Sequence, residues 1–238
     1  MCLIYRTAED GSAPEEILRT DGAEGYLFET TRIKNDFKVA EATAAILKKR
    51  VSGWMLSRVW FALLSCERVD MALWHVLADV WARGRHAEAD LAGEYIRAVH
   101  GAALRTSREY NRYLGLVRFS DVGGVFYARL EPDCDVLTLL ADHFSARLPG
   151  QGWVLHDPRR GKAAVYDGKG WFVTNMNLPQ APTPTEEEQK YRELWRGFYR
   201  ATTTRQRLNH TVQRGHMPKK YWKHLVENPG EFHASVLA

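Results

Sequence analysis

Hydrophobic residues in the first half of the chain recur at helical spacing. The stretch 67–84 has the clearest stripe, and Gly84 is placed to end this helix. The stripe consists of Val69, Leu73, Val76, Leu77 and Val80. Weaker stripes in 37–50 and 88–115 predict further helices, so we expect residues 36–114 to be helical.

The hydrophobic period changes after residue 115, where short apolar runs are rich in β-branched and aromatic residues. The runs "LVRFSDV" and "GVFYARLE" flank two glycines, which predicts a hairpin. A helix is expected over 135–148, with Asp135 as its N-cap. Three further strands are expected in "WVLHD", "KAAVYDG" and "GWFVT". Tight turns between neighbours favour an antiparallel sheet of about five strands with one packed helix, which is an α+β fold.

The C-terminal part is predicted to be helical again. The Pro-rich connector "NLPQAPTPT" is followed by Thr185 and Glu188, which form a capping box. The helix that starts there is expected to turn one apolar stripe inward: Tyr191, Leu194, Trp195 and Phe198. A second helix is expected over 205–214, with Leu208 and Val212 facing the core.

These elements suggest one integrated domain over residues 36–225. It would comprise a helical part (36–114), a sheet (115–178) and a basic helical C-terminal part (185–225). Residues 1–35 are expected to be a weakly ordered N-terminal segment, and 226–238 a tail. The length of 238 residues is sufficient for one large domain with a real core.

Composition excludes several classes of protein. No apolar run approaches the length of a membrane span, and the first residues do not resemble a signal peptide. The three cysteines are widely spaced, which fits a reducing, cytoplasmic location. No CxxC, HExxH or three-cysteine iron–sulfur spacing is present, so we expect neither a metal nor another cofactor.

Charge changes the picture more than composition does. The chain has a formal net charge of +4, yet residues 190–224 hold ten Lys or Arg and one acid, Glu193. That segment therefore carries +9 and the rest of the chain −5. A mildly acidic body with a strongly basic segment is typical of a phosphate-binding face, although a solvated charged helix is the alternative interpretation.

The basic segment also holds groups that can contact bases. On the predicted helix Asn209 and Gln213 form one row of amides, which can bond two edge atoms of a base. Tyr221 and Trp222 offer flat rings for stacking on a base. Burial of Trp222 in the core is an equally good interpretation, and His216 could equally be an ordinary surface histidine. Four cations are candidate phosphate contacts: Arg207, Arg214, Lys219 and Lys220.

A second polar cluster lies in "HDPRRGKAAVYDG". Asp157 beside Arg159 and Arg160 has two interpretations, an ordinary ion pair in a turn or a carboxylate near a sugar with the arginines on phosphate. Arg118 is unusual within a predicted strand. If it points inward it needs an acid, and Asp121 or Glu109 could serve.

Three stretches resemble an uncharacterised family described as DNA-metabolism proteins. They are "GLVRFSDVGGVFYARLEPDCDVL", "ADHFSARLPGQGWVLHDPRRGKAAVYDG" and "NHTVQRGHMPKKYWKHL", within a resemblance over roughly residues 36–225. Members of that family occur fused to, or encoded beside, uracil-DNA-glycosylase-like proteins and a radical-SAM protein assigned to DNA repair. The motifs of uracil-DNA glycosylases themselves are absent. The resemblance therefore implies work on DNA without donating a catalytic residue. Arg118, Arg159 and Arg160 match the family pattern, and we count them with the candidate phosphate contacts.

Two functions follow as hypotheses. In the first, the chain is a DNA glycosylase that flips out a damaged or modified base and cuts its N-glycosidic bond. Asp157, or else Asp121, would stabilise the developing positive charge on the sugar, and His216, Asn209 or Gln213 would stabilise the departing base. A hypermodified phage base as substrate would make the role antiviral.

In the second hypothesis, the chain is a non-catalytic DNA-binding module that serves a partner glycosylase or repair enzyme. Both hypotheses make double-stranded DNA with a modified or damaged base the expected partner. A monomer is the favoured state, and no membrane is involved.

Overall fold

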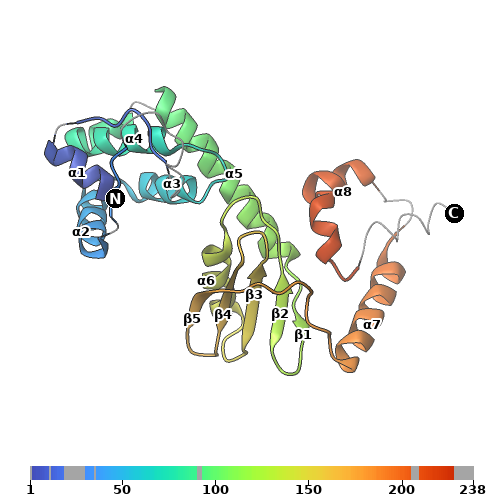
Figure 1. Cartoon of the computed structure of the whole chain (residues 1–238). Coiled ribbons are helices and arrows are strands. Elements are labelled where there is room, and N and C mark those ends of the chain that lie inside the picture. The colour runs from blue at the N-terminus through green and yellow to red at the C-terminus, as the bar shows by residue number, and fades with distance from the viewer. Residues whose placement is uncertain are drawn as a thin grey trace. The chain divides into compact units, whose positions relative to one another are not determined.

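Two separate groups of buried apolar side chains divide the chain in the computed structural model. Figure 1 shows its helices and strands in chain order. The structure describes residues 2–10, 12–18, 30–34, 36–89, 93–204 and 209–227. Its two compact units are Met1–Ser107 and Arg108–Ala238, and the boundary falls within helix α5 (Glu94–Leu116). That boundary lies inside residues 36–225, the range that the sequence predicts as one integrated domain. That this range folds as one domain stays a prediction.

Helices build the first unit. They are α1 (Cys2–Asp10), α2 (Phe37–Arg50), α3 (Gly53–Leu63), α4 (Asp70–Arg83), the 3-10 helix η1 (Gly84–Ala89) and the first part of α5. Asp36 begins α2, because its carboxylate accepts hydrogen bonds from the N–H groups of Lys38 and Val39 at 2.9 and 3.2 Å. Gly84 ends α4 as predicted, with a φ of 61° that favours glycine.

The helix α1 lies in the segment that the sequence predicts to be weakly ordered. Its Ile4 side chain is buried in the core of the first unit. The Trp74 indole Nε1 of α4 donates to Thr7 Oγ1 at 3.0 Å. These long-range contacts, which no local pattern reveals, hold the short helix in place.

A mixed sheet forms the centre of the second unit. Its strands are β1 (Ser120–Asp121), β2 (Phe126–Arg129), β3 (Trp153–Asp157), β4 (Lys162–Tyr166) and β5 (Trp171–Asn175), hydrogen-bonded in the order β1-β2-β3-β4-β5. The α+β class and the five strands are confirmed. The β1–β2 hairpin turns through Gly123 and Gly124, whose φ values of 68° and 88° suit glycine.

One strand pairing differs from the predicted antiparallel sheet. β2 and β3 run parallel, with Phe126 opposite Trp153 and Arg129 opposite His156. The helix between them, α6 (Leu137–Arg147), is long enough to return the chain to the same end of the sheet, which a parallel pair requires. α6 is the predicted packed helix, but its N-cap is Val136 rather than Asp135, and no side chain caps it.

Alternate strand residues form the core of the second unit. Trp153 and Leu155 of β3 are buried in one cluster with Leu140 and Phe144 of α6. His156 is also buried, between the sheet and the chain that follows β5. Tyr127 Oη lies 2.6 Å from His156 Nδ1, and Nε2 lies 3.2 Å from the Met176 carbonyl oxygen.

The C-terminal elements follow a connector that Figure 1 shows crossing the sheet from β5 toward the β1 edge. They are α7 (Glu186–Thr202), α8 (His210–His216) and the 3-10 helix η3 (Lys219–His224). Thr185 caps α7 as predicted, because its Oγ1 accepts from the Glu188 N–H at 3.2 Å. The Thr185 N–H donates to the Asp121 carbonyl oxygen at 3.2 Å, which fixes the start of α7 beside β1.

The predicted inward faces of the C-terminal helices are wrong. α7 has no buried residue, and its whole apolar stripe is exposed. Polar contacts attach α7 instead: Arg192 donates to Ser120 Oγ, and Arg196 Nε donates to the Val226 carbonyl oxygen at 3.0 Å. On α8, Val212 is 53% exposed, and Leu208 lies outside the described residues.

No helix in the described part of the chain is long and apolar enough to cross a membrane.

Candidate nucleic-acid interface

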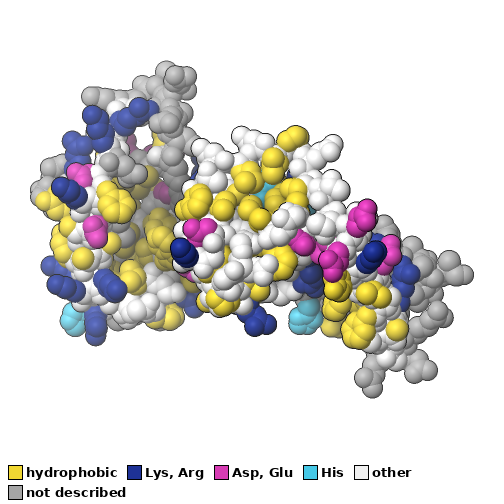
Figure 2. Space-filling view, turned by 90° about the horizontal axis from the view of Figure 1, so that it is seen from below, with side chains coloured by type: hydrophobic (Ala, Val, Ile, Leu, Met, Phe, Trp, Pro, Cys, Tyr) yellow, Lys and Arg dark blue, Asp and Glu magenta, His cyan; other side chains and the backbone are white. Residues whose placement is uncertain are grey.

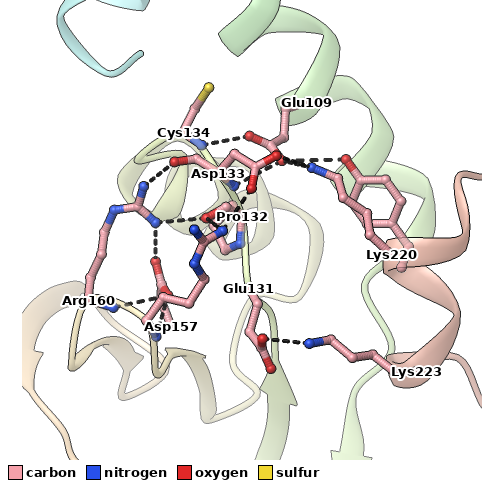
Figure 3. Close-up of polar contacts among 11 residues, drawn as sticks. Glu109, Glu131, Pro132, Asp133, Cys134, Asp157, Arg160, Lys220 and Lys223 are labelled. Atoms are coloured by element: carbon pink, nitrogen blue, oxygen red, sulfur yellow. Dashed lines mark hydrogen bonds and ion pairs between the residues drawn. The ribbon is translucent and has the colours of Figure 1, made fainter. Parts of the chain in front are cut away.

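Three segments that are distant in sequence meet at one end of the sheet. They are the loop 131–135 after β2, the turn 157–160 after β3, and η3 with the residues before it (217–224). The first two segments are neighbours because β2 and β3 are parallel, so both strands finish at the same end of the sheet. Figure 3 shows the polar side chains that join all three segments. We call them the acid–base network, and its members are Glu109, Glu131, Asp133, Asp157, Arg159, Arg160, Lys220 and Lys223.

Glu109 of α5 is the buried centre of the acid–base network. One carboxylate oxygen accepts from the Cys134 N–H at 2.7 Å, and the other from the Asp133 N–H at 3.1 Å and Lys220 Nζ at 2.7 Å. Burial by itself would raise the pKa of Glu109. The hydrogen bonds from Lys220 and the two backbone N–H groups outweigh burial and hold the pKa below its ordinary value.

Lys220 of η3 joins two carboxylates. Its Nζ lies 2.7 Å from Glu109 and 2.6 Å from Asp133 Oδ2. Burial acts to lower the pKa of Lys220, but the hydrogen bonds to Asp133 and Glu109 are stronger and raise it. Two carboxylates of the same chain therefore pair with the ammonium. The main role of Lys220 is thus to hold η3 against α5 and the loop after β2, and a phosphate contact is secondary.

Asp157 is fully buried, and its contacts are those of a turn. Oδ1 accepts from the N–H groups of Arg159 and Arg160 at 3.0 and 3.4 Å, and Oδ2 accepts from Arg160 Nη1 at 2.7 Å. Arg160 Nη1 also donates to the Pro132 carbonyl oxygen at 3.0 Å. This geometry corresponds to the ion-pair interpretation, and it leaves Asp157 no exposed oxygen with which to approach a sugar.

The other predicted arginines also find acids or carbonyls. Arg159 Nη1 lies 2.7 Å from Asp133 Oδ1, and about half of its side chain is exposed. Arg118 pairs with Glu227 at 2.8 Å, rather than with Asp121 or Glu109. Its Nη1 also donates to the Gly115 carbonyl oxygen at 2.8 Å. Arg118 thus joins the loop that precedes β1 to Glu227, while its assignment to a phosphate stays a prediction.

The predicted base-binding amides serve as structural groups. Asn209 is the N-cap of α8, where its Oδ1 accepts from the N–H groups of Thr211 and Val212 at 3.2 and 3.0 Å. The Gln213 side chain hydrogen-bonds Tyr199 and so joins α8 to α7. Gln213 is half-buried, whereas His216 at the end of α8 is exposed.

The two predicted stacking rings have different positions. Tyr221 is buried in the core and lies edge-on to Tyr113, with ring centroids 5.0 Å apart, so it cannot stack on a base. Trp222 is half-buried, and its Nε1 donates to the Met217 carbonyl oxygen at 2.9 Å. Lys219 Nζ lies 5.9 Å from the centre of the Trp222 ring, a cation–π distance.

The structure does not bring the two candidate catalytic aspartates together. Asp121 ends β1, and its Oδ1 accepts from the Gly124 N–H at 2.7 Å within the hairpin that precedes β2. Asp157 ends β3, at the opposite end of the sheet, because β2 and β3 are parallel. Arg207 lies outside the described residues.

The sequence did not reveal which acids pair with the basic segment, although it offers Glu109 as a partner for Arg118. Besides Glu109 and Asp133, Glu131 lies 2.5 Å from Lys223 Nζ and 3.4 Å from His224 Nε2. A loop as rich in polar residues as "EPDCD" was the available sign, because a carboxylate next to a buried strand needs a partner. Among the described residues, no group of three or more His, Cys, Asp or Glu could hold a metal ion.

Several cations of the basic segment remain at the surface outside the acid–base network. On α7, α8 and η3 the exposed ones are Lys190, Arg196, Arg200, Arg214 and Lys219. The only acid in 190–224 is Glu193. The first turn of α7 adds the acids Glu186, Glu187 and Glu188, so the positive surface begins after that turn and continues on α8 and η3.

The comparisons with known proteins identify a family. The family model described as a domain of unknown function, DUF4130, matches residues 67–227, and the chain belongs to this family. A search of curated proteins and a search of solved structures each found no match.

Proposed function

We propose that the second unit binds DNA through its C-terminal part and serves as a module for a partner enzyme that acts on DNA. The exposed cations of α7, α8 and η3 support this proposal, since residues 190–224 hold ten Lys or Arg and a single acid, Glu193. Lys and Arg side chains at a surface hold phosphates and set the affinity for nucleic acid.

The acid–base network gives these cations a fixed base. Tyr221 buries its ring in the core, and Lys220 joins η3 to α5 and to the loop after β2. Lys219, the exposed neighbour, is thereby presented on a held element rather than on a free tail. A cation that is already ordered loses less conformational entropy on binding a phosphate.

The family resemblance supports an enzyme partner. Relatives that are fused to, or encoded beside, glycosylase-like proteins and a radical-SAM protein assigned to DNA repair suggest that the catalytic step belongs to such a partner. The DNA would carry a damaged or modified base, and a phage base would make the function antiviral.

Base excision by this chain itself is the second proposal. It needs an accessible carboxylate near the sugar, and the burial of Asp157 weighs against that residue. Asp121 and the exposed His216 are then the remaining candidates for catalysis. We place binding first for this reason.

Binding to a labelled DNA duplex tests the proposal. Affinity, measured by fluorescence anisotropy between about 50 and 200 mM salt, should fall with a log–log slope of about −0.9 for each phosphate contact. Absence of binding at the lowest salt concentration would contradict the proposal.

An excision assay with the same protein separates the two proposals. Duplexes that carry damaged or modified bases, including glucosylated hydroxymethylcytosine, are incubated and then treated with alkali to cut abasic sites. Binding without nicking supports the module, and nicking supports the glycosylase.

A further inference from the structure

The apolar stripe of α7 faces solvent. Its four side chains are largely exposed: Tyr191 61%, Leu194 68%, Trp195 44% and Phe198 58%. Figure 2 shows hydrophobic side chains gathered over α7 at the right of the view. An exposed patch of large apolar side chains marks an interaction surface more often than a chance feature.

The way α7 is attached explains why the stripe stays open. Arg192, Arg196 and Tyr199 lie on another side of the helix and contact Ser120, Val226 and Gln213. Within the stripe, Trp195 Nε1 donates to Glu227 Oε2 at 3.4 Å, and the residue remains 44% exposed. The stripe residues 191, 194, 195 and 198 repeat at spacings of three and four and so form one face. This face is available to a ligand.

The chemistry of the stripe favours unpaired nucleotides. Three of its four side chains are aromatic, and the Trp195 and Phe198 rings stack with centroids 5.7 Å apart and planes 30° apart. Exposed cations lie on the same helix, Lys190 before the stripe and Arg200 after it. Aromatic rings next to cations are typical of single-strand binding. Each base can stack on a ring, and each phosphate carries a negative charge that a Lys or Arg can bind.

We propose that the α7 stripe binds single-stranded DNA, with bases stacked on Tyr191, Trp195 and Phe198 and phosphates near Lys190 and Arg200. The inference rests on the proposed function, because it takes DNA as the ligand. It goes further in naming unpaired nucleotides as the form recognised and α7 as the place. Residues 190–224 carry +9 and complement a polyanion, and Lys190 and Arg200 both follow the acidic first turn of α7, which holds Glu186, Glu187 and Glu188.

The test compares three labelled probes that share one phosphate backbone. They are a thymidine single strand of about 12 nucleotides, a length within known site sizes, an abasic single strand of the same length, and a duplex. The full-length protein should bind the thymidine strand at least about tenfold more tightly than the abasic strand, because only the former can stack.

The variant Tyr191→Leu/Trp195→Leu/Phe198→Leu keeps the stripe apolar and removes its rings. Leucine is also a better helix former than the aromatic residues, so α7 should persist, which circular dichroism checks. The variant should bind the thymidine and abasic strands equally, with the affinity for the abasic strand unchanged. Phe172→Leu, which replaces a ring that is 55% exposed on β5, is the matched control and should keep the preference.

The outcomes separate this inference from the proposed function. Binding of all three probes with equal affinity overturns the inference and leaves DNA binding intact, and the stripe would then suit a protein partner. Binding of none overturns both. If the triple variant unfolds, the single variant Trp195→Leu is measured instead. A preference for the thymidine strand over the abasic strand that is as large as in the wild type would then overturn the inference.

Discussion

Lys220 Nζ lies 2.7 Å from the Glu109 carboxylate, although 111 residues separate them in the chain. The pair joins the C-terminal basic segment to the helix that leads into the sheet. Because Glu109 is buried and also accepts two backbone N–H groups, this contact holds the arrangement of the loop after β2 as well.

Lys220→Met should destabilise the second unit. The change keeps the apolar stem and removes the charge that satisfies Glu109, so we expect a loss of about 1–3 kcal/mol in the free energy of unfolding. Urea denaturation measures it. The neighbouring Lys219→Met removes an exposed charge and should stay within about 0.5 kcal/mol of the wild type. Equal effects of the two variants would mean that the pair contributes nothing.

The same two lysines should differ in the opposite sense in DNA binding. Lys219→Ala should make the log–log salt slope shallower by about 0.9, as loss of one phosphate contact does. Lys220→Ala should change the slope less, because Glu109 and Asp133 already engage its charge. Anisotropy titrations at several salt concentrations compare them, with Lys169→Ala in the β4–β5 turn as the control. An unchanged slope in Lys219→Ala removes that residue from the interface.

Stability should fall on acidification in two stages. Burial lowers the pKa of His156 and of His224 from 6.5, so the folded state binds fewer protons than the unfolded state. Their contribution is present above about pH 6.5 and is lost as pH falls below it. The pKa values of Glu109, Glu131 and Asp133 are also lowered, and their contribution is lost at lower pH, from about 4.5 downward.

Melting temperatures recorded across this range show both stages. His156→Phe lowers stability at neutral pH, because Tyr127 Oη and the Met176 carbonyl oxygen lose a partner. It should also reduce the pH dependence below about pH 6.5, since one titrating group is gone. A slope that the variant leaves unaltered would assign the first stage to other groups.

Asp157→Asn should act mainly on stability. The amide oxygen can still accept from the Arg159 N–H, but the charge that pairs with Arg160 is lost, and we expect a cost of about 1–3 kcal/mol. Thermal unfolding and the excision assay are measured on the same sample. If base release occurs and is abolished while stability is unchanged, the catalytic role first expected for Asp157 is restored.

The sequence predicted the elements better than their contacts. The apolar stripe of 67–84, the two glycines of the hairpin and the Thr185 cap are local patterns, and the structure contains each of them. The parallel pairing of β2 and β3 was not predicted. The residues of a run such as "WVLHD" indicate a strand, but they do not indicate whether it pairs parallel or antiparallel with its neighbour.

The candidate site was less predictable than the fold. An amphipathic stripe shows which face of α7 is apolar but not whether anything covers it. Ion pairs between distant residues, such as Arg118 with Glu227, leave no periodic trace in the chain. The sequence therefore showed the basic residues, but it did not show which acids pair with them.

The long span between Glu109 and Lys220 has a consequence for synthesis on the ribosome. At 5–20 residues per second, roughly 5 to 20 s pass between the appearance of the acid and of its cation. During that time the strands and α6 can associate, because their contacts are closer in sequence, while Glu109 has only backbone donors. Nascent chains that stop short of residue 220 should therefore be more open to proteases than the completed protein.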